Sequence, residues 1–167
     1  MPHVGTVQLI KVRRDNSFVM KKNVVYGVLM QPSSLVKKAF RQAKQARQKA
    51  HAPYSHYRVG AALITNKKQI FTGCNVENAS YGATICAERV AILKAVSSGN
   101  KNFSDLVVLT QAREPVSPCA LCLQIMAEFC GPNTQIWVAN PTGIKHVFNF
   151  SELLKEPFGP KQLRKKK

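Results

Sequence analysis

The sequence predicts a single α/β domain built on a mixed sheet of about five strands, with helices packed on both faces. Two observations lead to this class. Helical and strand-like patterns follow one another in the order α-β-β-α-β-α-β-β, which one sheet with helices packed on it accommodates. The chain has 167 residues, of which 45% are hydrophobic, and this is enough for one domain with its own core.

The first half of the domain is predicted to contain one helix and a hairpin. Pro32, Ser33 and Ser34 are expected to open this helix with a Ser N-cap, and small or apolar residues recur at helical spacing as far as Ala50. The other faces of this helix carry Lys, Arg and Gln, which we interpret as a water-facing surface. Two β-like runs follow at residues 59–65 and 69–76, and the short polar turn between them is typical of a hairpin.

The second half is predicted to alternate helices with strands. Apolar residues recur at helical spacing over residues 84–98, and Gly99 ends that helix. Ser117 and Pro118 are expected to be the N-cap and first residue of a further helix, which Gly131 ends. The remaining strands are predicted at residues 106–110, 135–139 and 144–150.

Charge is concentrated at the two ends of the chain. Residues 1–52 carry eleven Lys or Arg and one Asp, for a net charge of +10, whereas residues 53–160 carry +2 and residues 161–167 carry +5. We therefore divide the chain into a basic N-terminal extension at 1–31 (a hairpin or a loose segment), a folded domain at 32–160 and a basic tail. Such ends attract polyanions, so we expect non-specific contact with nucleic acid rather than a dedicated groove.

The composition predicts a cytoplasmic protein with no membrane partner. No apolar run approaches the length of a membrane span, and no signal peptide is recognisable. The five cysteines form an odd set, which makes a disulfide framework an unsuitable explanation. Cys74 and Cys130 are expected to be buried free thiols.

The remaining three cysteines predict a catalytic zinc site. Cys86, Cys119 and Cys122 fall at the predicted starts of two helices, where the helix dipole favours thiolate over thiol. Three thiolate ligands leave the fourth position of a tetrahedral zinc ion open for water. Glu88, two residues after the first cysteine, is placed to move protons as a general acid–base group. This residue set matches that of the zinc-dependent nucleobase deaminases.

The predicted zinc site carries excess negative charge. Three thiolates on a dication leave a net negative centre, and Arg89 is the nearest counter-charge in the sequence.

The alternative is a closed structural zinc site with Cys74 as its fourth ligand. That alternative leaves Glu88 without a role, and a lone Cys-x-x-Cys pair is weak evidence because redox sites share it.

The chain resembles the zinc-dependent cytidine deaminases of the small homotetrameric type over residues 34–163. The resemblance starts from the cysteine motifs and extends to three longer stretches and a shorter C-terminal part. These segments are PYSHY at 53–57, VGAAL at 59–63, TGCNVENASYG at 72–82, ELL at 152–154 and PFGP at 157–160.

The resemblance implies hydrolytic deamination of cytidine and deoxycytidine with release of ammonia, in pyrimidine salvage, with one Zn²⁺ per chain. Zinc-bound hydroxide would attack the base while Glu88 moves the protons. Asn75 and Glu77 would hold the ribose hydroxyls, for which an amide and a carboxylate are suited. The backbone of Ala87 would read the pyrimidine edge.

The resemblance also implies a homotetramer with shared active sites. Tyr57 would flank the base, at a position that usually holds Phe. Phe158 would stack on the base from a neighbouring subunit, and Tyr81 would reach into a neighbour's site. Leu123 departs from the family pattern, which usually has Arg after the second cysteine of the pair.

Two other functions are compatible with the metal motif. One is deamination of a modified cytosine nucleoside such as blasticidin S. The other is deamination of cytosine in single-stranded nucleic acid, which the basic ends could bind. An aromatic residue closing over the base argues against the second, because a strand needs an open path into the site.

Overall fold

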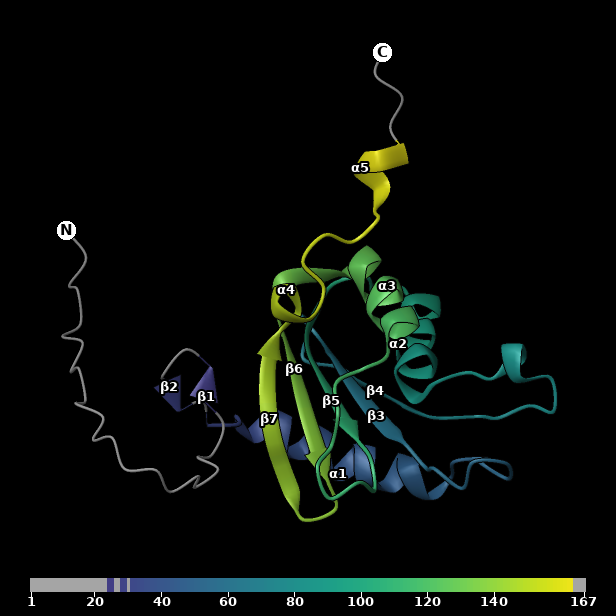
Figure 1. Ribbon diagram of the computed structural model, residues 1–167. Coiled ribbons are helices and arrows are strands. Elements are labelled where there is room, and N and C mark those ends of the chain that lie inside the picture. The colour runs from purple at the N-terminus through teal and green to yellow at the C-terminus, as the bar shows by residue number, and fades with distance from the viewer. Residues whose placement is uncertain (1–23, 26–27, 30, 164–167) are drawn as a thin grey trace, which may run out of the picture.

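The computed structural model describes residues 24–25, 28–29 and 31–163 and contains the mixed α/β sheet that the sequence predicts (Figure 1). Most of the N-terminal extension at 1–31, for which the sequence analysis leaves a hairpin or a loose segment open, lies outside the described residues. The elements are β1 (Val24–Val25), β2 (Val28–Leu29), α1 (Ser34–Gln48), β3 (Gly60–Thr65), β4 (Ile70–Cys74), a 3₁₀ turn η1 (Tyr81–Ala83), α2 (Ala87–Ser97), β5 (Phe103–Leu109), α3 (Ala120–Phe129), β6 (Cys130–Asn140), β7 (Gly143–Asn149), α4 (Phe150–Leu153) and α5 (Pro160–Leu163).

The main sheet has five strands in the order β4-β3-β5-β6-β7. β5 and β6 are parallel and are joined through α3, whereas the other three neighbouring pairs are antiparallel. A parallel pair requires such a crossover. The crossover brings the chain from the carboxyl end of β5 to the start of α3, which is where two of the predicted metal ligands lie.

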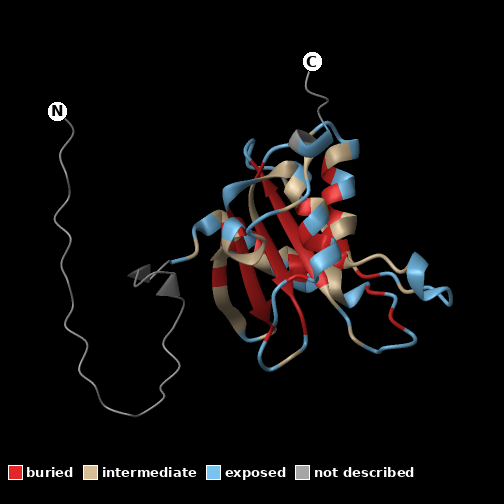
Figure 2. Cartoon of the chain, turned by 45° about the horizontal axis from the view of Figure 1, so that its top comes forward, coloured by how far each residue is buried: buried red, intermediate tan, exposed pale blue. Residues whose placement is uncertain are grey.

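Helices cover both faces of this sheet, as the sequence predicts. α1 packs on one face of the sheet, against side chains of β3, β5 and β6. α2 and α3 pack on the other face. The central strands β3 and β5 are almost wholly buried between these layers (Figure 2). None of the helices in the described part of the chain is both long and apolar enough to cross a lipid bilayer.

Two glycines allow the helices to approach the sheet closely. A Cβ atom on Gly73 of β4 would lie 2.6 Å from the backbone nitrogen of Ala91 in α2, and one on Gly60 of β3 would lie 2.7 Å from that of Arg47 in α1. Both distances are shorter than van der Waals contact. The beginning of α2, which carries Glu88, is therefore set against β4 at a distance that only glycine permits.

Both helices of the predicted metal site begin later than expected. The predictions placed the start of α2 at residue 84 and that of α3 at Pro118, but the helices begin at Ala87 and Ala120. Cys86 and Cys119 have extended backbone angles, with ψ values of 154° and 161°, and are themselves the N-cap residues. Their carbonyls accept the first backbone hydrogen bonds of the two helices.

Strand boundaries also differ from the prediction around α3. The helix was expected to continue to Gly131, but it ends at Phe129, because Cys130 adopts an extended conformation and pairs with Phe103. β5 and β6 are accordingly longer than the predicted 106–110 and 135–139. α4 and α5 were not predicted. α4 is held by a capping box in which Asn149 and Glu152 bond to each other's backbone N–H groups.

Candidate active site

The fold brings the three predicted cysteines together. The sulfur atoms of Cys86, Cys119 and Cys122 all lie within 4.8 Å of one another. Cys86 caps α2 and Cys119 caps α3, while Cys122 is in the first turn of α3. Neither cap sulfur accepts a hydrogen bond from a backbone N–H group of its own helix, so both remain available to a ligand at the positive ends of two helix dipoles.

The electrostatics of the three sulfurs suit a metal ion. The Cys122 thiol donates a hydrogen bond to Cys86, and this bond, with the nearby Arg89 guanidinium, lowers the pKa of Cys86 to about 5. The same shared proton, together with burial, raises the pKa of Cys122. A cation that replaces the proton would be held by three soft sulfur donors, which zinc accepts in tetrahedral sites. The donor set therefore fits Zn²⁺ and leaves one coordination position to a non-protein ligand.

Glu88 is buried beside this cluster, with 5% of its surface exposed. Burial raises the pKa of its carboxyl group to about 7. Its side chain lines a cavity of about 350 Å³ that Cys86 and Cys119 also line. A cavity of this size suits a small molecule, and it places a proton-transferring group and two of the sulfurs against the same ligand.

Two predicted ribose-binding residues line the cavity but already bind backbone. The Asn75 carboxamide accepts from the Val59 N–H at 2.8 Å and donates to the Tyr57 carbonyl at 2.8 Å. The Glu77 carboxylate accepts from the N–H groups of Tyr54 and Ser55 at 2.9 and 3.2 Å and from the Ser55 hydroxyl. Both side chains therefore hold the wall of the cavity in place, and each has lone pairs or a proton left for a ligand.

The remaining predicted substrate residues divide into two groups. Tyr57 and Ala87 line the cavity with Glu88. Tyr81 and Phe158 do not: they are 76% and 58% exposed, and Tyr81 lines an adjoining cavity with Tyr54 and Glu77. Within one chain, the structure does not bring these two aromatic side chains into the cavity of the cysteines.

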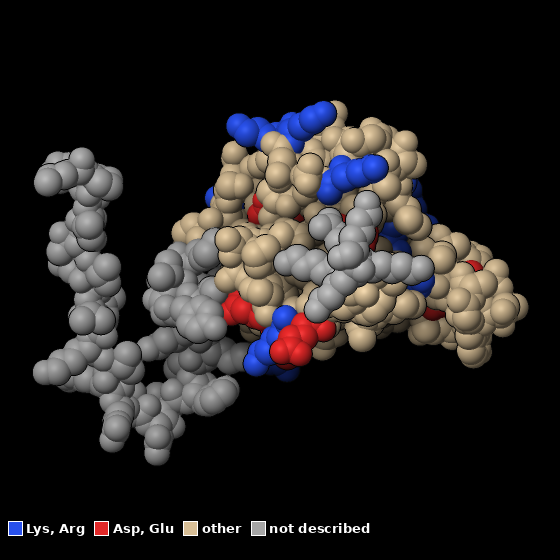
Figure 3. All heavy atoms as spheres, turned by 90° about the horizontal axis from the view of Figure 1, so that it is seen from above, with Lys and Arg blue, Asp and Glu red and all other residues tan. Residues whose placement is uncertain are grey.

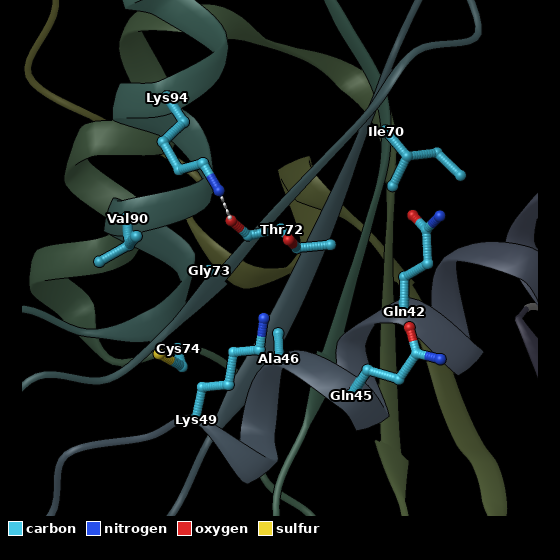
Figure 4. Close-up of a pocket in the computed structure, with 10 residues that line it drawn as sticks. All are labelled: Gln42, Gln45, Ala46, Lys49, Ile70, Thr72, Gly73, Cys74, Val90 and Lys94. Carbon is cyan, nitrogen blue, oxygen red and sulfur yellow. Dashed lines mark hydrogen bonds between the residues drawn. The ribbon is translucent and has the colours of Figure 1, made fainter.

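Cys74 lies apart from the sulfur cluster. Its side chain lines a different groove of about 410 Å³ along the free edge of β4, between α1 and α2 (Figure 4). In this groove Lys94 Nζ donates to the carbonyl oxygen of Thr72 at 2.7 Å. None of the predicted catalytic or metal-binding residues lines the groove, and the group of converging sulfurs does not include Cys74.

Leu123, the departure from the family pattern, is part of the core. It is 7% exposed and packs with residues of α2 and β5. The apolar surroundings suit leucine at position 123, where the family pattern usually has Arg. The cation nearest to the sulfurs in the described part of the chain is Arg89, whose Nη2 lies 3.5 Å from the Cys86 sulfur.

Several cavity residues were not singled out from the sequence. They are Ser55, Val59, Thr84, Val108, Thr110, Val116 and Ser117. The signal for Thr110 was available, because it follows the apolar β5 run and shares the side-chain direction of Val108 two residues earlier. Val108 itself lies in β5, and the other five residues come from irregular segments, for which periodicity gives no direction.

Comparisons with known proteins agree with this fold and this cluster. The family model of the cytidine and deoxycytidylate deaminase zinc-binding region matches residues 33–138. Cytidine deaminases of Sporosarcina psychrophila and Halalkalibacterium halodurans are 41% and 42% identical to the chain, over 77% and 71% of it and over 94% and 89% of their own lengths.

Solved structures give the same result. The crystal structure of cytidine deaminase from Burkholderia pseudomallei is 41% identical, with a TM-score of 0.70 over 73% of this chain and 98% of that one. Cytidine deaminase from Mycobacterium tuberculosis is 32% identical, with a TM-score of 0.63 over 74% of this chain and 96% of that one. Fold and site define a zinc-dependent hydrolase. The chain belongs to the cytidine and deoxycytidylate deaminase family.

Proposed function

We propose that this protein hydrolyses cytidine and deoxycytidine to uridine and deoxyuridine, with release of ammonia. The observation that carries the proposal is a cluster of three thiols, two of which line a cavity together with a buried carboxylate, Glu88. The high identity to proteins named cytidine deaminase favours the ordinary nucleoside over a modified one such as blasticidin S.

We propose that Cys86, Cys119 and Cys122 hold one zinc ion. Zinc in such a site lowers the pKa of water and so supplies a nucleophile near neutral pH. Arg89 offsets part of the negative charge of the three thiolates, and the two helix N-termini offset more.

Glu88 is the proton carrier in this proposal. Its carboxylate takes a proton from the attacking water and delivers it to N3 of the ring, and it later carries the proton of the new C4 hydroxyl group to the departing amino group. Water thus adds across the C4–N3 bond, the C4–N4 bond breaks, and the products are uridine and ammonia. Burial of Glu88 within the cavity keeps bulk water from competing for these protons.

Nucleoside binding is assigned to the residues that form the cavity wall. Asn75 and Glu77 bind the ribose hydroxyls through the capacity that their backbone contacts leave free. Tyr57 flanks the base, and the backbone of Ala87 reads its edge. The rigid positions of Asn75 and Glu77 favour binding, because little side-chain freedom is lost when the nucleoside enters.

We propose that the active form is a homotetramer in which neighbours complete each site. Several large apolar side chains of the described residues are exposed: Val116, which lines the cavity, is 65% exposed and Leu121 56%, besides Tyr81 and Phe158. In one chain these side chains face water, which a subunit interface would avoid. Phe158 of one subunit would then close the cavity of another.

A weak, non-specific contact with nucleic acid is the second candidate property. Residues 32–76 contain nine Lys or Arg and no acidic residue, and α1 contributes five of them on the sheet face opposite to α2 and α3. Figure 3 looks onto the end of the sheet that carries α4 and α5, where the visible described surface is mostly uncharged, with a few separate Lys or Arg and Asp or Glu side chains. A strand bound at α1 would not be led to the cysteines, which favours simple electrostatic attraction over editing.

A substrate panel tests these proposals. Purified zinc-loaded protein is incubated with cytidine, deoxycytidine, blasticidin S and short single-stranded RNA or DNA, and ammonia and the change in ultraviolet absorbance are recorded. Rapid turnover of the two free nucleosides is expected. Strand deamination that is faster than cytidine deamination would contradict the proposal. A role in pyrimidine salvage and a cytoplasmic location remain predictions.

A further inference from the structure

Thr110 is a buried polar residue in the wall of the cavity. It follows the last residue of β5, its backbone N–H donates to the carbonyl of Ala139 at 3.0 Å, and it is 4% exposed. Alternate residues of β5 point to opposite faces of the sheet, so Thr110 shares the side of Val108, which belongs to the core under α2 and α3. Both side chains line the cavity with Glu88.

The hydroxyl group of Thr110 has no hydrogen-bond partner among the described residues. The other two buried threonines of the described chain differ in this respect. Thr65 Oγ1 accepts from the Gln69 N–H at 3.2 Å, and Thr134 Oγ1 donates to the Phe103 carbonyl at 3.2 Å. A buried hydroxyl without a partner destabilises the folded state, whereas valine would fill the same volume without that cost.

Two other polar side chains of the cavity wall do not supply a hydrogen-bond partner for the Thr110 hydroxyl group. Asn75 and Glu77 bind the backbone around Tyr57 and Ser55. The apolar side chains of Val59 and Val108 form another part of the lining. The unpaired hydroxyl is therefore free to bind a ligand of the cavity.

The register of the sheet indicates which part of a bound nucleoside the Thr110 hydroxyl group would contact. The Asn75 N–H donates to the Val59 carbonyl at 3.2 Å, and the next residue, Gly60, pairs with Leu109 beside Thr110. Thr110 thus lies two strand spacings from Asn75, or about 10 Å. With the ribose at Asn75 and Glu77, the base would extend towards β5.

We propose that Thr110 is a substrate-positioning residue, whose hydroxyl hydrogen-bonds the pyrimidine base of the bound nucleoside. The proposal rests on the proposed function, since it takes the ligand to be cytidine or deoxycytidine. It adds a base-binding group to the site from the end of β5, a strand that carries none of the predicted site residues.

The test compares Thr110→Val, Thr110→Ser and the control Thr134→Val. Thr110→Val should raise KM for cytidine and deoxycytidine alike, by about three- to tenfold, as expected for one hydrogen bond, with kcat changed by less than about twofold. Thr110→Ser keeps the hydroxyl and should reverse most of the KM change. Melting temperatures supply a readout independent of activity: Thr110→Val should melt at or above the wild-type temperature, whereas Thr134→Val should melt lower with KM unchanged.

Two results would overturn the proposal. One is an unchanged KM in Thr110→Val, and if the melting temperature of that variant also fell, the hydroxyl would have an internal partner. The other is a KM increase for cytidine alone, which would assign the contact to the 2′-hydroxyl. Failure of the proposed function is distinguishable, because the wild-type protein itself would then neither bind nor deaminate cytidine.

Discussion

Arg89 contacts both the first cysteine of the cluster and the segment that precedes it. Its Nη2 lies 3.5 Å from the Cys86 sulfur and donates to the carbonyl oxygen of Thr84 at 2.6 Å. The guanidinium therefore holds the approach to α2 in place and provides positive charge next to a thiolate. In a structure where Leu123 is buried in the core, this is the cation on which the charge balance of the cluster rests.

Replacing Arg89 should weaken metal retention. Arg89→Ala removes the positive charge beside Cys86, so we expect faster loss of zinc to a chelator and a lower deamination rate. Zinc content after dialysis against a competing chelator measures the first effect. Arg41→Ala, on the exposed side of α1, is the control for general loss of positive charge. Equal zinc retention in both variants would show that the helix N-termini balance the thiolates without Arg89.

Glu88→Gln should separate metal binding from chemistry. The amide has nearly the shape of the carboxylate but cannot accept the proton of water, so turnover should fall by about three decades or more, at or above the middle of the range for a general acid–base group. Zinc content and nucleoside binding should be retained, as measured by metal analysis and calorimetry. A variant that keeps most of its activity would exclude Glu88 from proton transfer.

Substitutions should distinguish the zinc-binding cysteines from Cys74, which we expect to have no role in zinc binding. Cys119→Ala is expected to lose zinc and much of its stability, because thiolate ligation is coupled to folding. Cys74→Ser is the matched control, since Cys74 lies in the groove at the edge of β4, and it should keep both zinc and activity. Loss of zinc from Cys74→Ser would support the closed structural site instead.

Gly73→Ala should destabilise the protein. The added Cβ would lie 2.6 Å from the backbone nitrogen of Ala91, and because backbone atoms cannot move aside easily, α2 must shift. Overpacking of this kind costs about 1–3 kcal/mol, measurable by urea unfolding. Gly131→Ala is the control, because a Cβ there meets no atom within 4 Å. Equal stabilities of the two variants would mean that α2 moves freely on the sheet.

Glu77 should contribute to stability in a pH-dependent way. The hydrogen bond from the Ser55 hydroxyl, with those from two backbone N–H groups, lowers the pKa of Glu77 below its ordinary 4.5. The contribution is therefore complete above pH 4.5 and is lost as the pH falls through the folded-state value. Wild type should be more stable than Glu77→Gln at pH 7, and the difference should shrink on acidification. Glu128→Gln, at an exposed position, is the control for the loss of a surface carboxylate.

The sequence predicts those parts of the molecule that local patterns determine. The order of helices and strands follows from apolar periodicity, and the cysteine spacing indicates a shared site because Cys119 and Cys122 are one helical turn apart. The helix starts were wrong, since Ser117 and Pro118 suit a helix start as well as an extended segment. Only the tertiary structure shows that the cysteines are the caps. The backbone contacts of Asn75 and Glu77 link segments about twenty residues apart, which no periodicity reveals.

Because Cys86 and Cys119 each end an extended segment and begin a helix, whatever joins their sulfurs also ties two distant parts of the chain. The second of these parts, from the end of β5 to α3, supplies one side of the cavity through Thr110, Val116, Ser117 and Cys119. The bound ion would thus orient this crossover with respect to α2. Affinity for the nucleoside should then depend on the ion even where no substrate atom touches it, and a metal-free chain should lose its binding surface along with its chemistry.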